Sequence, residues 1–159
     1  MGRLQYLMIH CTATPEGRDV SAQSVKSMHM DKPPKGHGWD RVGYASLLLL
    51  DGTEHRFTTF DEDQIVSNHE LTYGAGEMNA VSCHICYVGG MDKPYKNAKD
   101  TRTDAQKKGL EKFVKDFLQV HPQVKVCGHY DFCRKACPSF DVQKWCEEIG
   151  IPETNIYRK

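Results

Sequence analysis

The stretch CGHYDFCRKACPS, residues Cys127–Ser139, gathers the most chemically reactive side chains of this chain. Its first eleven residues contain three thiols, an imidazole, an arginine and a lysine. Residues 125–129 are typical of a short strand that brings His129 to its end. The Pro-Ser pair resembles a helix start, so residues 139–148 are expected to form a helix with Trp145 on its buried side. Thiolates and imidazoles are preferred zinc ligands, which makes this stretch a candidate metal site.

Two kinds of zinc site are compatible with these side chains. A local site would use four ligands from the stretch itself: Cys127, His129, Cys133 and Cys137. Such a closed site is structural and does no chemistry. A distributed site would use His10, His129 and Cys137 and leave the fourth position for water, as metal-assisted hydrolysis requires. The spacing of the ligands alone favours neither arrangement.

The remainder of the chain predicts strands and helices that can form one layered domain. Strands are expected at residues 6–9, 42–50, 53–57 and 82–90, with a tight Asp51-Gly52 turn between the second and third. Helices are expected at 21–30, where Ser21 is a candidate N-cap, and at 103–120, which begins with a capping-box pattern. This order indicates an α/β (α+β) fold, with a central mixed β-sheet flanked by helices. We expect a single domain over residues 1–159.

Cys83 and Cys86 form a C-x-x-C pattern that also occurs in zinc and redox sites. Both lie in the predicted strand at residues 82–90, where side chains three positions apart point to opposite faces. We therefore expect the two thiols to be buried separately and to serve structure.

The composition excludes several classes of function. Lys+Arg and Asp+Glu both number 21, so the net charge is zero, which argues against a nucleic-acid-binding protein. The seven cysteines are an odd number and the N-terminus lacks the apolar run of a signal peptide, which indicates a reducing compartment. The longest apolar run, Tyr44–Leu50, is too short to insert in a membrane. We expect a monomer that is cytoplasmic when synthesised.

Five segments resemble, in order and spacing, a known family of enzymes. They are His10–Thr14, Val42–Tyr44, Asp51–Thr53, Tyr87–Gly90 and, most specifically, KACPSFD at Lys135–Asp141. Together they resemble the phage lysozyme-type N-acetylmuramoyl-L-alanine amidases. These are zinc type 2 amidases that share their fold with peptidoglycan recognition proteins. The resemblance extends from about Tyr6 to Trp145, nearly the whole chain.

The resemblance implies a role for six residues. The metal ligands fall on His10, His129 and Cys137, the catalytic residues on Tyr44 and Lys135, and a histidine near the cleft on His69. Trp39, with His37 in the same Pro- and Gly-rich loop, is a candidate wall of the substrate cleft.

The implied reaction is hydrolysis of the amide between N-acetylmuramic acid and L-alanine of the stem peptide, with one Zn²⁺ per chain. The metal and Lys135 would offset negative charge on the carbonyl oxygen, and Tyr44 would orient water or deliver a proton. Peptidoglycan is therefore the expected partner. A phage or prophage endolysin of this kind would reach the cell wall through a membrane lesion made by another protein.

Two other functions agree with parts of the pattern. A peptidoglycan-binding module without activity would share the fold, although members that only bind typically lack the cysteine ligand that Cys137 supplies here. A small structural zinc protein would use the local site, and Cys133, which departs from the family pattern, would favour it. Some family members also inhibit RNA polymerase through a segment before the first strand, and we do not expect that activity with only residues 1–5 in that place.

Overall fold

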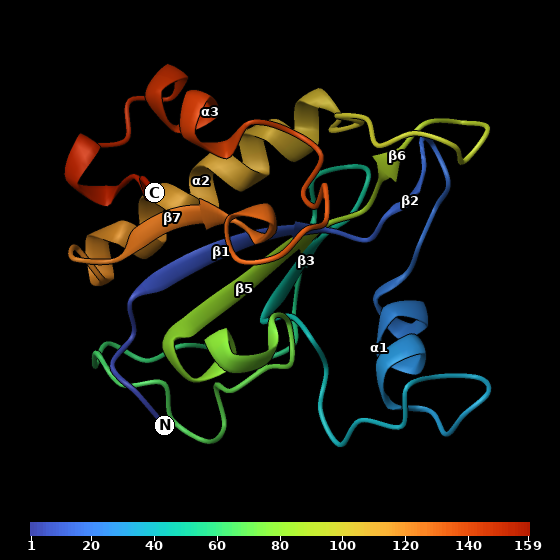
Figure 1. The fold of residues 1–159 in the computed structure, drawn as a ribbon, viewed down its shortest axis with the longest axis horizontal. Coiled ribbons are helices and arrows are strands. Elements are labelled where there is room, and N and C mark those ends of the chain that lie inside the picture. Colours follow the sequence, from blue (N-terminus) through green and yellow to red (C-terminus); the bar gives the residue numbers. More distant parts are fainter.

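The computed structural model describes residues 1–159 and is organised around a five-stranded mixed sheet (Figure 1). The order of its strands is β4-β3-β5-β1-β7. Their bounds are β1 (Tyr6–Cys11), β3 (Ser46–Leu48), β4 (Glu54–Arg56), β5 (Ser82–Tyr87) and β7 (Lys125–Gly128). β3, β5, β1 and β7 are parallel to one another, and β4 pairs antiparallel with β3. The mixed sheet expected from the sequence is confirmed.

The other elements are three helices, three short 3-10 helices and a small two-stranded sheet. The helices are α1 (Ala22–Met30), α2 (Asp104–Val120) and α3 (Val142–Glu148). The 3-10 helices are η1 (Gly76–Val81), η2 (His129–Asp131) and η3 (Glu153–Asn155), and β2 (Thr14–Pro15) pairs with β6 (Gly90–Met91). No helix of the structure combines the length and the apolar character needed to cross a bilayer.

The larger hydrophobic core lies between the sheet and the pair of helices α2 and α3 (Figure 1). Leu7 and Ile9 of β1 enter it from the sheet, Leu110 and Val114 from α2, and Trp145 from α3. These residues alternate along β1 and recur at helical spacing along α2, as the sequence pattern predicts. The amphipathic stripe of α2 and the buried side of α3 therefore cover one face of the sheet together.

The opposite face of the sheet carries a smaller apolar cluster, which includes Val25 of α1 and Leu47 of β3. Cys86 of β5 belongs to this cluster, whereas Cys83 belongs to the larger core on the other face. The prediction that the C-x-x-C thiols point to opposite faces is confirmed, because β5 is regular strand across both residues.

Both predicted N-caps are present. The Ser21 hydroxyl accepts the Ser24 N–H at 3.0 Å, and Thr103 forms a reciprocal capping box with Gln106. Each satisfies N–H groups that a helix start would leave unpaired.

Three predicted elements are clearly shorter than expected. The strand at residues 82–90 ends at Tyr87 as β5, and Gly90 begins β6 of the small sheet. The strand at residues 42–50 is limited to β3, because the backbone before it bonds elsewhere: the Gly43 N–H donates to the His29 ring at 3.1 Å. The last helix begins at Val142 and not at Ser139, which has a left-handed φ of 70°. Asp141 is its N-cap and accepts the Lys144 N–H at 3.0 Å.

Candidate functional site

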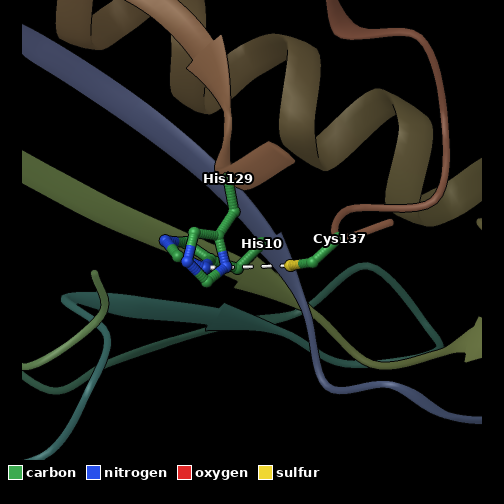
Figure 2. A group of neighbouring side chains, drawn as sticks. All are labelled: His10, His129 and Cys137. Carbon is green, nitrogen blue, oxygen red and sulfur yellow. Dashed lines mark hydrogen bonds between the residues drawn. The ribbon is translucent and has the colours of Figure 1, made fainter. Parts of the chain in front are cut away.

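Three donor side chains that are far apart in sequence meet at one end of the parallel strands (Figure 2). β1 and β7 are neighbours with Ile9 opposite Gly128. His10, the next residue of β1, therefore comes close to His129, which follows β7 as the first residue of η2. Cys137 reaches them from the loop between η2 and α3. The donor atoms of the three residues all lie within 4.8 Å of one another, and His10 Nδ1 is 3.8 Å from Cys137 Sγ.

Hydrogen bonds hold the loop that carries Cys137 against the sheet. The Cys11 N–H donates to Cys137 Sγ at 3.2 Å, and the Tyr130 N–H donates to the Cys137 carbonyl at 2.8 Å. One residue further on, the buried Tyr87 hydroxyl donates to the Pro138 carbonyl at 2.6 Å. The thiol is therefore positioned by β1, by η2 and by β5 at once.

The three donors suit a zinc ion in both geometry and protonation. Zn–N and Zn–S bonds of about 2.05 and 2.3 Å at a tetrahedral angle separate the two donor atoms by about 3.6 Å, close to the separation of His10 Nδ1 and Cys137 Sγ. Burial and then the neighbouring His84, His129 and Lys135 lower the pKa of His10 well below its usual range. Burial and Lys135 also lower the pKa of His129. Both imidazoles are thus neutral at neutral pH, as metal binding requires.

The local four-ligand site is not assembled. Cys127 is fully buried on β7 and directs its thiol to the Leu7 carbonyl at 3.7 Å. The Cys133 thiol lies 3.3 Å from the His129 carbonyl. Neither thiol belongs to the group formed by His10, His129 and Cys137, so the geometry favours the distributed site with an open position.

The two predicted catalytic residues both influence the triad. The ring of Tyr44 is 5.3 Å from that of His10 between centroids, and burial raises the pKa of its phenol well above the usual value. Lys135 is exposed, yet its charge contributes to the lowered pKa of both His10 and His129. A protonated phenol therefore lies beside His10, and the charge of Lys135 acts on both histidines of the triad.

The predicted substrate contacts lie farther from the triad. Trp39 stacks on His29 with centroids 5.1 Å apart, and His29 in turn contacts Tyr44 at 5.2 Å, so Trp39 continues an aromatic row that begins at the site. His69 is exposed, and its ring bonds to the Ser67 hydroxyl at 2.8 Å, in a group with Asp61 and Glu70. A substrate role for Trp39 and His69 stays a prediction.

Two buried histidines beside the site were not anticipated from the sequence. His84 Nδ1 lies 2.9 Å from His10 Nε2, and His29 Nδ1 accepts the Gly43 N–H next to Tyr44. Strand alternation places His84 on the same face of β5 as Cys86, but its contact with His10 depends on the pairing of β1 with β5. That pairing has no local sequence signal.

Comparison with known proteins agrees with the fold and with the family resemblance of the sequence. A family model described as N-acetylmuramoyl-L-alanine amidase matches residues 1–140. The endolysin of Enterobacteria phage K11 is 32% identical over 137 residues, covering 86% of this chain and 82% of that protein.

Solved structures share the fold at lower sequence identity. The Ph2119 endolysin from the Thermus scotoductus MAT2119 bacteriophage superimposes with a TM-score of 0.69 at 21% identity, over 94% of this chain and 87% of that one. Drosophila PGRP-LB superimposes with a TM-score of 0.67 at 16% identity, over 100% and 88%. The expected type 2 amidase and peptidoglycan recognition protein fold is confirmed, and the chain belongs to the N-acetylmuramoyl-L-alanine amidase family.

Proposed function

We propose that this protein is a zinc-dependent peptidoglycan hydrolase that cleaves the amide between N-acetylmuramic acid and L-alanine of the stem peptide. The observation that carries the proposal is the convergence of His10, His129 and Cys137 within 4.8 Å, beside Tyr44, in a chain of this family. Two imidazoles and a thiolate would hold one zinc ion and leave a position open. The bound ion would supply a Lewis acid and a water of lowered pKa.

Tyr44 is suited to protonate the leaving group. An amide nitrogen leaves poorly unless it gains a proton, so hydrolysis needs a donor near the scissile bond. Because burial raises the pKa of the Tyr44 phenol well above its usual value, this group keeps its proton at neutral pH. Its ring centroid is 5.3 Å from that of His10, which supports a role beside the candidate metal position.

Lys135 is suited to stabilise charge on the carbonyl oxygen. Attack on the amide carbon moves negative charge to that oxygen, and a fixed cation nearby lowers the energy of this state. The influence of the Lys135 ammonium on both histidine ligands supports a position close to the reacting bond.

The proposal extends to the biological setting. The named phage endolysins among the relatives support action on the bacterial cell wall, and we propose that the protein works there as a monomer after passing through a membrane lesion from the cytoplasm. A family member that only bound muropeptides would share the fold without releasing products.

The decisive experiment is mass spectrometry of purified peptidoglycan digested with the wild-type protein, with chelator-treated protein and with zinc-restored protein. We expect stem peptides with a free N-terminal L-alanine, lost with chelator and regained with zinc. Cys137→Ala should abolish release, whereas the matched control Cys133→Ser should retain it. Cleavage of another bond, binding without cleavage, or full activity of Cys137→Ala would each contradict the proposal.

A further inference from the structure

A second buried histidine contacts the side of His10 that faces away from Cys137. His84 lies on β5, which pairs in parallel with β1, with Met8 opposite His84 and His10 opposite Cys86. His10 Nε2 and His84 Nδ1 are 2.9 Å apart, and the two side chains are 1% and 0% exposed. This is a direct hydrogen bond between imidazoles, shielded from water.

The geometry assigns opposite tasks to the two nitrogens of His10. Nδ1 faces Cys137 Sγ at 3.8 Å, so it is the nitrogen available to a metal and must carry a lone pair. In a neutral imidazole the proton then lies on Nε2. His84 Nδ1 is the acceptor that the structure offers to that proton.

The surroundings of His84 hold its ring in this orientation and leave one of its polar atoms unpaired. Gly74 lies against the ring, and a Cβ at Gly74 would come within 2.6 Å of His84 Cγ. His84 Nε2 is buried without a hydrogen-bond partner in the protein. An unpaired buried polar atom is unfavourable, and an apolar side chain would fill the same space without it. Packing alone therefore does not account for a histidine here.

We propose that His84 is a positioning residue for the metal site: its Nδ1 accepts the Nε2–H of His10 and so keeps the Nδ1 lone pair of His10 directed at the position between Cys137 and His129. This inference rests on the zinc role proposed above for His10. His84 is not one of the three grouped donors, and it acts through its bond to His10. Groups that orient a metal-binding histidine in this way contribute substantially to metal affinity.

The test compares two nearly isosteric substitutions, His84→Asn and His84→Leu. The Oδ1 of asparagine stands where Nδ1 of the histidine stood and can accept the same proton, whereas the corresponding leucine methyl cannot. Zinc affinity of the folded, metal-free proteins is measured by competition with a chromophoric chelator. We expect His84→Leu to bind zinc about 10- to 100-fold more weakly and His84→Asn to remain within roughly threefold of wild type.

His121→Leu is the matched control, because His121 is also 1% exposed but bonds to Gln64. The Gln64 carbonyl accepts the Leu4 N–H just before β1, at the opposite end of that strand from His10. His121→Leu should bind zinc as wild type does. Equal affinities of His84→Leu and wild type, or equal losses in His84→Leu and His84→Asn, would overturn the inference.

A second measurement needs no substitution. Long-range proton–nitrogen NMR correlations of the metal-free wild type should show His10 as the Nε2–H tautomer, with this proton protected from exchange. His10 in the Nδ1–H tautomer would refute the positioning role. Failure of the wild type to bind zinc would instead refute the proposed function, so the two failures are distinguishable.

Discussion

Replacing Tyr87 by phenylalanine tests how the sheet supports the candidate metal site. Tyr87 is fully buried at the end of β5, and its hydroxyl donates to the Pro138 carbonyl at 2.6 Å. Pro138 is also buried and directly follows Cys137. Phenylalanine keeps the ring, which packs against Phe140 with centroids 6.2 Å apart, and removes only the hydroxyl.

The expected loss of stability follows from the burial of the Pro138 carbonyl. Without the Tyr87 hydroxyl, the Pro138 carbonyl loses this bond in a site that is closed to water, a change worth about 1–3 kcal/mol. For a domain of this size each kcal/mol lowers Tm by about 2–4 °C, so the variant should melt roughly 2–12 °C below wild type. Zinc affinity should fall as well, since the freed carbonyl loosens the backbone next to Cys137.

Thermal unfolding of the metal-free protein, followed by circular dichroism, measures the first effect, and chelator competition measures the second. Tyr157→Phe is the control, because the Tyr157 ring packs against Phe132 at 5.1 Å while its hydroxyl makes no hydrogen bond in the structure. If Tyr87→Phe and Tyr157→Phe melt within about 1 °C of each other, the Pro138 bond does not contribute as argued.

Three further predictions concern the site and its scaffold. Burial lowers the pKa of His84 to about 3 and that of His29 to about 4. Histidine in the unfolded chain has a pKa of about 6.5, so below pH 6.5 the unfolded chain binds more protons than the folded protein. The metal-free protein should lose about 1.4 kcal/mol per pH unit for each of these histidines as pH falls below 6.5, and urea unfolding that shows constant stability from pH 7 to 5 would contradict this. Tyr44→Phe should lower kcat on peptidoglycan by about 10²- to 10⁴-fold with zinc content unchanged, and a rate near wild type would exclude Tyr44 as the proton donor. Thr103→Ala removes the side chain that accepts the Gln106 N–H at 3.0 Å and should cost about 0.5–2 kcal/mol of stability, with no change in zinc affinity.

Elements whose signals are local could be predicted from the sequence. Helix α2 matches the expected range because its apolar stripe and capping box lie within the segment itself. The opposite burial of Cys83 and Cys86 likewise follows from alternation along one strand. The predicted start of α3 at Ser139 is wrong, although Pro138-Ser139 resembles a helix start. The backbone at Ser139 is left-handed, and Asp141 forms the N-cap.

The contacts between strands could not be predicted from the sequence. The sequence alone contained candidate ligands for two different zinc sites, and their spacing did not choose between them. The pairing of β1 with β7 brings His10 to His129, and the loop held by Tyr87 adds Cys137, while Cys127 and Cys133 bond to backbone carbonyls.

The sequence by itself therefore determined the residue types, the periodicities and the family resemblance, because these depend on neighbours along the chain. Only the tertiary structure decided which donors meet and that His84 lies behind His10, 74 positions away. Such contacts depend on strand register, where a shift of one residue would turn His84 to the opposite face of the sheet and away from His10.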